Sequence, residues 1–375
     1  MSEWKEYNIG DLLYLEYGKS LNNYRTGFGK FEVFGTNGKI GFTDVFLHNE
    51  PSIIIGRKGA YREVHFAKNP FFVIDTAFYT KKKTNKTDTV FMYYWFKNID
   101  INAMDSGSAI PSTSRDEVYE LEILLPSLAE QIQIASILSS LDDKIDLQHR
   151  QNNTLERLAE TLFRQWFVEE RNKDEEILLG DYVQRINGYS YNSTELKPSE
   201  DALVTLKSFN RDGSFRMDGF KEFIGKINEH QTVKQGDLVV AHTDITQEAD
   251  VIGNPVLVIE HPKYKTLVIT MDCVKVVPKD KRFSIPFLYF LMKTREFKFH
   301  CLGCSNGTTV LHLSKEAIPS FTFPKPDFEK VKLFTEQAKE IIQKQFNNHS
   351  QIQNLTQLRD MLLPKLMSGE VRVKK

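Results

Sequence analysis

The chain has 375 residues, 41% of them hydrophobic, and its formal net charge at pH 7 is −1. This length suits two or three domains, and the composition is that of a globular protein rather than of a disordered or fibrous one. No apolar run approaches the roughly 18 residues of a membrane span, Met1–Lys5 is unlike a secretory signal peptide, and three cysteines form no disulfide framework. We therefore expect a cytoplasmic protein that does not enter a membrane.

Residues 1–126 are expected to form a mixed α/β domain of short strands and glycine-rich turns. The apolar run Ile53–Ile55 ends at Gly56, and a second strand pattern runs from Phe71 to Tyr79. Between Tyr17 and Lys97 there are thirteen Lys or Arg residues against six Asp or Glu. Such a local excess of positive charge favours a polyanionic partner.

The turn after the Ile53–Ile55 strand carries three cations and one aromatic ring within seven residues, Gly56–Arg62. Lysine and arginine suit phosphates, and arginine also suits the hydrogen-bonding edge of guanine. The turn Thr36–Lys39 has a similar composition. We take as candidate DNA-binding residues of this domain Lys19, Asn37, Lys39, Arg57, Lys58, Tyr61 and Arg62.

Residues 127–171 are expected to form one long helix. Ser127 and Glu130 have the spacing of a capping box, and no glycine or proline follows before residue 171. Alternate steps of four and three residues from Ile134 to Trp166 meet eight apolar residues in ten, which is the pattern of a coiled-coil seam. At ~1.5 Å per residue the helix is on the order of 60 Å long, so we interpret it as a spacer.

The second half of the chain repeats the first. Adding 200 to the seam positions gives a second seam from Phe334 to Leu366, in which seven of ten residues are apolar. The polar residues Gln148 and Asn348 stand at matching seam positions and would fix the register of a helix pair. Further matches, at offsets of 170 and then 200, join Gly10, Asp11, Gly18, Ser20 and Asn22 to Gly180, Asp181, Gly188, Ser190 and Asn192, and Gly107 and Ser114 to Gly307 and Ser314.

This repetition predicts four parts: a first domain over 1–126, a first helix over 127–171, a second domain over 172–325 and a second helix over 326–375. The second domain is again rich in strand patterns. Asp327 is expected to cap its helix, and Ser368-Gly369 to end it. The candidate binding residues of the second domain occupy turns like those of the first: Lys207, Asn210, Arg211, His242 and Thr243.

Motifs for catalysis are weak throughout. The run Gly303–Gly307 fits the Gly-x-Ser-x-Gly pattern of a hydrolase, but Ser305 has no serine counterpart in the first half. Asn69-Pro70-Phe71-Phe72 is similar to a DNA aminomethyltransferase loop but lacks its second proline. No phosphate loop and no zinc-type set of Cys and His is found. We expect no catalytic, cofactor or metal site in this chain.

The helices carry a family resemblance. LLPSLAEQIQIASILSSLDDKI and NNTLERLAETLFRQWF resemble the central conserved region of the specificity subunit of type I restriction and modification enzymes, and LRDMLLPKLMSGEVRV resembles its distal one. The resemblance implies two target-recognition domains, each reading one half of a split sequence in double-stranded DNA, separated by paired antiparallel helices. It also implies docking of two methyltransferase subunits and of restriction subunits. S-adenosylmethionine, ATP and magnesium would belong to those partners.

We therefore expect an α+β fold with two mixed α/β target-recognition domains joined by two long antiparallel coiled-coil helices, acting as a non-enzymatic DNA-recognition and scaffold subunit. The local two-fold symmetry of B-DNA favours two readers related by a two-fold, whose helices are then antiparallel. Two alternatives remain: a specificity subunit of a fused type II system, and a coiled-coil adaptor that never touches DNA. Salt-sensitive DNA binding by the partner complex separates the adaptor from the others.

Overall fold

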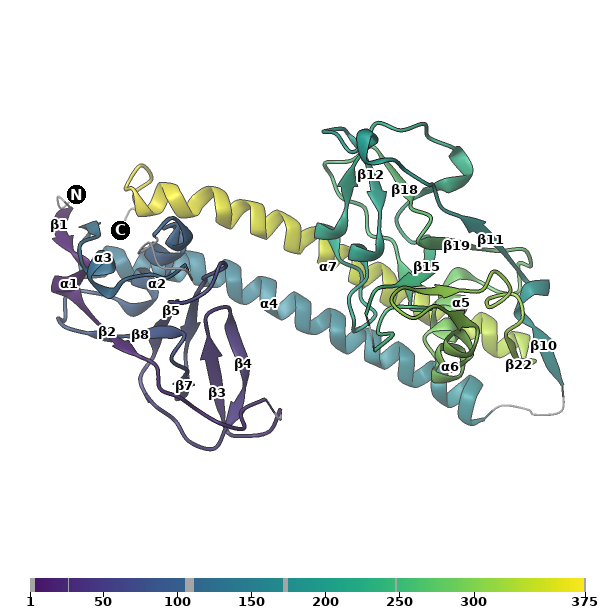
Figure 1. The fold of residues 1–375 in the computed structure, drawn as a ribbon, viewed down its shortest axis with the longest axis horizontal. Helices are drawn as coiled ribbons and strands as arrows, with labels where there is room; N and C mark the ends of the chain where they lie inside the picture. The colour runs from purple at the N-terminus through teal and green to yellow at the C-terminus, as the bar shows by residue number, and fades with distance from the viewer. Residues whose placement is uncertain (1–3, 26, 105–110, 171–174, 247, 374–375) are drawn as a thin grey trace. The chain divides into compact units, whose positions relative to one another are not determined.

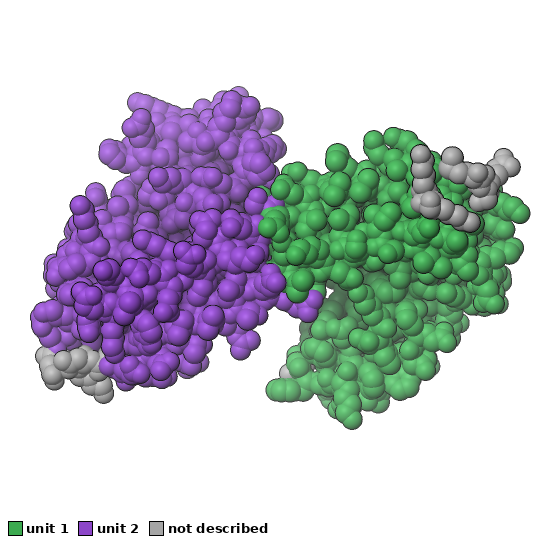
Figure 2. All heavy atoms as spheres, turned by 180° about the vertical axis from the view of Figure 1, so that it is seen from behind, with its two compact units in different colours: residues 1–148, 351–375 green, residues 149–350 purple. Residues whose placement is uncertain are grey.

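The computed structural model describes residues 4–25, 27–104, 111–170, 175–246 and 248–373. Gly107 and the predicted boundary between residues 171 and 172 lie outside the described residues. The chain divides into two compact units, which Figure 2 shows in green and purple. Unit 1 consists of residues 1–148 and 351–375, and unit 2 of residues 149–350. Both units combine β-sheets with helices, so the expected α+β class is confirmed.

In the described part of unit 1, the strands form one two-stranded pair and two larger sheets (Figure 1). The pair joins β1 (Lys5–Asn8) to β9 (Glu122–Leu125). The antiparallel four-stranded sheet has the order β2 (Leu13–Tyr17), β8 (Ala77–Lys82), β5 (Ser52–Gly56) and β6 (Val64–Ala67). The three-stranded sheet has the order β4 (Gly38–Thr43), β3 (Phe31–Gly35) and β7 (Phe71–Val73), in which β3 and β7 are parallel.

The helices of unit 1 pack on the four-stranded sheet. The short elements are α1 (Ile9–Leu12), η1 (Ile101–Ala103) and α3 (Arg115–Tyr119), and the central one is α2 (Thr89–Lys97). Asp88 caps α2 by accepting a hydrogen bond from the Phe91 backbone at 2.9 Å. The buried core that α2 shares with the sheet and with the long helices includes Ile53, Phe91, Trp95, Ile134, Leu138 and Leu366.

Two long helices run through both units. The first, α4 (Leu128–Arg164), continues as a π-helical turn, η2 (Gln165–Glu169), and the second is α7 (Phe328–Met367). The predicted helix start is confirmed, because the Glu130 backbone donates to Ser127 Oγ at 3.3 Å and α4 begins at the next residue after Ser127. At the far end, α7 contains Pro364 and continues to Met367 before Gly369, which has a φ of +75°.

Within each unit, α4 and α7 contact one another in antiparallel order. In unit 1, Arg359 bonds Asp142 at 2.8 Å and Gln148 bonds Gln351. In unit 2, Asn348 Nδ2 donates to Asn152 Oδ1 at 2.8 Å, and Gln345 donates to Glu156 at 2.9 Å. Residue numbers rise along α4 as they fall along α7 in both units. Hydrogen bonds between polar side chains therefore connect α4 to α7 in both units.

The described residues of unit 2 form one two-stranded pair and three larger sheets. The pair is β10 (Glu176–Leu178) with β22 (Thr322–Pro324). The other sheets have the orders β11 (Val183–Asn187), β19 (Cys273–Pro278), β15 (Leu238–Ala241), β17 (Pro255–Leu257); β13 (Lys221–Glu222), β12 (Asp201–Val204), β18 (Thr266–Ile269), β14 (Thr232–Val233); and β16 (Thr243–Asp244), β21 (Leu311–Leu313), β20 (Ser305–Asn306).

The helices of unit 2 are α5 (Ile285–Met292) and α6 (Arg295–Gly303), with the short 3-10 turns η3 (Leu179–Asp181), η4 (Ser193–Glu195), η5 (Leu206–Ser208), η6 (Met217–Gly219) and η7 (Glu229–Gln231). Ser284 caps α5, and the apolar residues that follow it are buried against α4 and α7. Ser305 lies in β20 and donates its hydroxyl to the Cys301 carbonyl at 2.7 Å. None of the helices in the described part of the chain is long and apolar enough to cross a membrane.

Several glycines that match between the two halves of the sequence have matching surroundings. A Cβ on Gly18 would lie 2.0 Å from the Ile74 carbonyl oxygen, and one on Gly188 would lie 2.0 Å from that of Thr270. Any side chain at either position would collide with backbone, which explains why both are glycine. The backbone contact of Ile9 with Leu121 at 2.9 Å also has a counterpart of the same length between Leu179 and Phe321. The two units therefore share local geometry at these points.

Candidate nucleic-acid interface

The loop after β5 in unit 1 is held by a neighbouring turn. A Cβ on Gly56, the last residue of β5, would lie 2.6 Å from the Thr36 carbonyl oxygen, so only glycine allows this approach. The Thr36 hydroxyl bonds the carbonyl oxygens of Lys58 and Thr76, each at 2.8 Å. The predicted turn at Asn37 and the predicted loop at Lys58 are thus brought together, and both side chains are exposed.

Cations and an aromatic ring gather at this loop. The Arg57 guanidinium lies 4.8 Å from the centre of the Tyr17 ring, and that of Arg115 lies 5.3 Å from the same ring. Arg57 also donates to the Asp75 carbonyl at 3.1 Å, while the Lys58 ammonium is 3.8 Å from the Asp75 carboxylate. We call Tyr17, Arg57, Lys58 and Arg115 the Arg57 cluster. Guanidinium groups held over a ring are oriented without being neutralised.

The other candidates of unit 1 have different surroundings. Lys19 follows β2 and is exposed, and the Tyr61 side chain is 77% exposed. Lys39 pairs with Glu32 at 2.7 Å across the β3–β4 hairpin. Arg62 is only 2% exposed, and its guanidinium donates to the Thr113 hydroxyl at 3.1 Å and to the Asn102 carbonyl at 3.0 Å. Arg62 therefore joins the loop to the segment before α3, and we exclude it from the candidate DNA-binding surface.

His242 follows β15 in unit 2 and is surrounded by positive charge. Its Nε2 is 3.4 Å from Arg185 Nη2, and its backbone donates to the Asp272 carbonyl at 2.7 Å. Burial, together with the charges of Arg185 and His312, lowers the pKa of His242 to about 4, and Lys315 acts in the same direction. We call His242, Arg185, His312 and Lys315 the His242 cluster. The His242 imidazole is neutral near pH 7. Because a guanidinium can only donate, Nε2 accepts from Arg185 and Nδ1 carries the donor proton.

The remaining candidates of unit 2 divide into exposed and buried residues. Lys207 is exposed, Asn210 donates to the Ser214 hydroxyl at 2.8 Å, and Arg211 reaches Asp250 at 3.4 Å. Thr243 is buried and donates to the Asp272 carboxylate at 3.0 Å. We therefore interpret Thr243 as a support for His242 rather than as a residue that meets a ligand.

Further polar contacts shape the segment that follows Thr243. The buried Asp244 accepts hydrogen bonds from the backbones of Val251 at 2.6 Å and Ile252 at 2.8 Å. The Lys298 ammonium donates to the Ile252 carbonyl at 2.7 Å and to the Asn254 side chain at 2.8 Å. These bonds anchor the described residues of the segment, while the Ile245 side chain remains 72% exposed.

The two clusters occupy matching backbone positions. The Thr113 backbone donates to the Arg57 carbonyl at 2.9 Å, and the Leu313 backbone donates to the His242 carbonyl at 2.8 Å. Arg115 and Lys315, two residues beyond each donor, are both cations. Sequence reasoning missed Tyr17, Arg115, Arg185, His312 and Lys315. The offset of 200 that joins Ser114 to Ser314 could have revealed Arg115 and Lys315, because both follow these serines directly.

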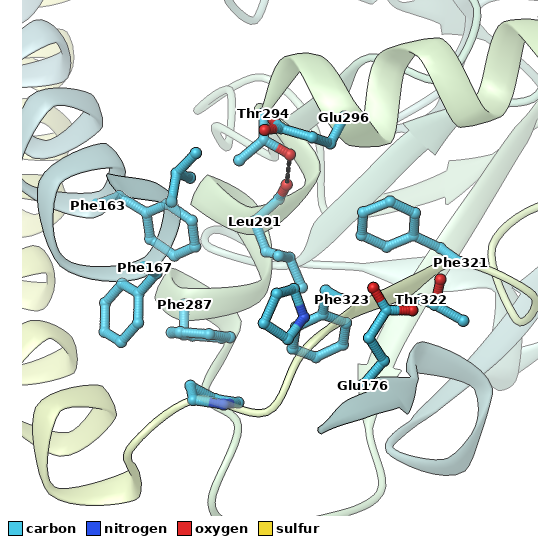
Figure 3. Close-up of a pocket in the computed structure, with 13 residues that line it drawn as sticks. Phe163, Phe167, Glu176, Phe287, Leu291, Thr294, Glu296, Phe321, Thr322 and Phe323 are labelled. Atoms are coloured by element: carbon cyan, nitrogen blue, oxygen red, sulfur yellow. Dashed lines mark hydrogen bonds between the residues drawn. The ribbon is translucent and has the colours of Figure 1, made fainter. Parts of the chain in front are cut away.

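Unit 2 also contains an aromatic pocket of about 330 Å³ (Figure 3). Its lining is mainly phenylalanine and proline, with Glu176 and Glu296 as its carboxylates. Thr294 donates its hydroxyl to the Leu291 carbonyl at 2.6 Å, as the dashed line in Figure 3 shows. We assign no chemistry to this pocket. The described residues also contain no group of three or more His, Cys, Asp or Glu placed to hold a metal ion.

Comparison with known proteins supports one family. Residues 1–157 match the family model described as the type I restriction modification DNA specificity domain. The type I restriction enzyme MjaIX specificity subunit of Methanocaldococcus jannaschii is 24% identical over 98% of this chain and 89% of that protein. The HindI specificity subunit of Haemophilus influenzae is 22% identical over 99% of this chain and 100% of that protein. The chain is thus similar to the specificity subunits of type I restriction-modification enzymes.

A solved structure extends the likeness to the fold. The type I restriction-modification S subunit from M. genitalium matches this chain with a TM-score of 0.64 and 18% sequence identity, over 97% of this chain and 96% of that chain. At this level of identity the match concerns the fold alone. Within that fold, this chain carries the Arg57 cluster in unit 1 and the His242 cluster in unit 2.

Proposed function

We propose that this chain is the specificity subunit of a type I restriction-modification enzyme and recognises a split sequence in double-stranded DNA, one half through each unit. The observation that carries the proposal is the matching backbone position of the Arg57 and His242 clusters, which differ in side-chain chemistry. Two recognition domains for different half-sequences need the same backbone geometry with different side chains at the contact positions. We call the part of each unit outside α4 and α7, including its short helices and its cluster, a reader.

The two clusters suit different contacts with DNA. In reader 1, Arg57 and Arg115 are charged donors with the fork that fits guanine O6 and N7 or a phosphate. In reader 2, the neutral His242 offers the donor Nδ1–H, while its Nε2 accepts from the cation Arg185. The exposed residues Lys19, Asn37, Lys58 and Tyr61 in reader 1, and Lys207 and Arg211 in reader 2, would add phosphate and base contacts. Affinity then falls as salt rises.

We further propose that α4 and α7 form an antiparallel coiled-coil spacer between the readers. The domain limits would be 1–126 and 172–325 for the readers, and 127–171 and 326–375 for the helices. Support comes from the antiparallel order of the Asp142–Arg359 contact in unit 1 and of the Asn152–Asn348 contact in unit 2. Buried amide pairs of this kind fix the register of paired helices.

The chain would act without catalysis of its own and would assemble with partners. The relatives are named as type I restriction enzyme specificity subunits. We propose two methyltransferase subunits and restriction subunits as partners, with S-adenosylmethionine, ATP and magnesium bound by those partners. A fused type II system, in which one partner chain methylates and cleaves, remains the second candidate because the same recognition layout serves both.

Co-purification with the methyltransferase partner tests the proposal. The complex is expected to bind its target DNA with an affinity that falls steeply with salt, and to methylate it. The isolated chain with S-adenosylmethionine is expected to transfer no methyl group. A complex that binds no DNA at low salt would favour the adaptor alternative, and methylation by the isolated chain would contradict a non-catalytic role. Cleavage by the methyltransferase chain itself would indicate a fused type II system.

A further inference from the structure

In unit 1, helix α2 of the reader is bonded to both long helices through one carboxylate. The Tyr94 hydroxyl donates to Asp142 Oδ2 on α4 at 2.7 Å. The other oxygen of Asp142 accepts a hydrogen bond from Arg359 on α7 at 2.8 Å. Burial and the bond to Asp142 raise the pKa of Tyr94 well above its usual value, so its hydroxyl remains a donor at any working pH. We call Tyr94, Asp142 and Arg359 the unit 1 pin.

In unit 2, helix α5 has the same kind of attachment. The Tyr289 hydroxyl donates to Glu156 Oε1 on α4 at 2.7 Å, and Gln345 on α7 donates to Glu156 Oε2 at 2.9 Å. Lys293, just after α5, bonds Glu156 at 2.5 Å and pairs with Glu160 at 2.6 Å. We call Tyr289, Glu156 and Gln345 the unit 2 pin. Burial raises the pKa of Tyr289 well above its usual value, so this hydroxyl also remains a donor.

Each of these reader helices has a second attachment at its N-terminal end. The Asp88 backbone, which caps α2, donates to Gln131 on α4 at 2.8 Å. The Ser284 hydroxyl, which caps α5, bonds the Thr335 hydroxyl on α7 at 2.8 Å. One bonded end leaves a helix free to swing, whereas a second bonded point fixes its direction. The apolar side chains that α2 and α5 pack against the long helices set an approximate crossing angle, with a scatter of about 15–20°. The directional polar bonds narrow this range.

Beyond the pins, a hollow separates the reader from the helix pair in each unit. In unit 1 a groove of about 1060 Å³ lies between residues such as Phe34 and His65 of the reader and Asp142 and Arg359 of the helices. In unit 2 a groove of about 510 Å³ lies between residues such as Phe215 and Asn152. Across the unit 1 groove, the exposed Lys68–Asp143 pair at 3.1 Å contributes little orientation.

From this arrangement we propose that the two pins are positioning contacts that fix the angle between each reader and the helix pair. They thereby determine which gap between the two half-sequences the complex accepts. This inference rests on the proposed function, since it concerns how two readers are aligned on one DNA. A base pair added to the gap moves the second half-site by ~3.4 Å and turns it by about 34°. A reader held at two points cannot follow that turn, whereas a reader held at one point can.

The test uses the complex with its methyltransferase partner, made with Tyr94→Phe, with Tyr289→Phe and with both. Each change removes one oxygen atom and leaves the ring in place. Binding is measured on DNA with the native gap and with gaps one base pair shorter and longer. We expect the preference for the native gap to fall roughly tenfold for Tyr94→Phe, which is about 1.4 kcal/mol. The fall is smaller for Tyr289→Phe, because Lys293 still bonds Glu156 at that end of α5. The preferred bases within both half-sequences stay unchanged.

Tyr93→Phe is the matched control, because Tyr93 lies on the same helix and its ring packs on Phe66 at 5.4 Å, while the described contacts include no hydrogen bond of its hydroxyl. This control should keep the native gap preference. Thermal melting of each complex verifies assembly, and if Tyr94→Phe does not assemble, Tyr289→Phe carries the same test in unit 2. An unchanged gap profile in an assembled pin variant overturns the inference. A parent complex that shows no gap preference at all instead overturns the proposed function.

Discussion

The carbonyl oxygens of Arg57 and His242 accept hydrogen bonds of nearly equal length, 2.9 Å from the Thr113 backbone and 2.8 Å from the Leu313 backbone. The residues in the two positions differ in charge near pH 7, because the guanidinium is a permanent cation and the imidazole, with a pKa of about 4, is neutral. The two readers thus present different hydrogen-bonding groups from one backbone frame. This difference leads to a separate expectation for each half-sequence.

Replacement of Arg57 by Ala should affect one half-sequence only. If the guanidinium forks to a guanine, the loss is ~1–3 kcal/mol and base preference relaxes at one position. If it contacts only phosphate, binding weakens equally for all sequences. His242→Gln serves as the reciprocal variant and should alter only the other half-sequence. Selection of bound sequences from a random pool measures both, and a change in both halves from either single variant would contradict separate readers.

Replacement of Arg62 by Met should destabilise unit 1 without changing base preference. The guanidinium is buried and bonds Thr113 and Asn102, which would be left without these partners. A loss of about 1–3 kcal/mol in the free energy of unfolding is expected. Denaturant unfolding of the chain measures it, and Lys39→Ala, at the surface pair with Glu32, is the control with little expected loss. A normal stability together with altered base preference would show that Arg62 meets DNA.

The stability of unit 2 should fall as the pH is lowered from about 6.5 to about 4. Burial lowers the pKa of both His242 and His349 to about 4, with help from Arg185 for the first and His149 for the second. The unfolded chain, whose histidines titrate near 6.5, therefore binds more protons in this window, and the folded state loses stability as pH falls. Melting temperatures between pH 4 and pH 7 measure the effect. His349→Gln should flatten the profile, and an unchanged or steeper slope in that variant would contradict the assignment.

Lengthening both helices should change the accepted gap. Seven residues inserted after Gln148 and seven after Asn348 keep the heptad pattern and lengthen the spacer by ~10 Å, roughly three base pairs of DNA. Three base pairs rotate the groove by about 100°, whereas a heptad leaves the helix face almost unturned. Binding to the original site should fall sharply, and newly selected sites should keep both half-sequences. Undiminished binding at the original gap would show that the helices do not set the distance.

Local signals made part of this structure predictable from the sequence. The capping residue Ser127 and the absence of glycine and proline identified α4. The match of Gly18 with Gly188 indicated a repeat, and the structure shows a close backbone approach at both positions. Whether each of two neighbouring cations is exposed or buried was not predictable from local signals. Arg57 and Arg62 lie in one turn, yet Arg62 is buried because Asn102 and Thr113, far along the chain, supply its acceptors. The low pKa of His242 likewise depends on Arg185 and His312, which only the fold brings near.

The pins could not be predicted from the sequence either, because their residues lie far apart along the chain. Asp142 and Glu156 look like exposed acids of a long helix, and only the packing of α2 and α5 brings Tyr94 and Tyr289 to them. A heptad pattern predicts which residues face the partner helix, but not which flanking residues meet a third element.

The most direct test of the central claim is methylation sequencing of cells that carry the complete system, compared with cells that lack this gene and with cells that carry His242→Gln. We predict a methylated motif made of two half-sequences with a fixed gap, lost entirely without the gene and changed in one half only by the substitution. A motif that persists without the gene, or that is continuous rather than split, would contradict the account.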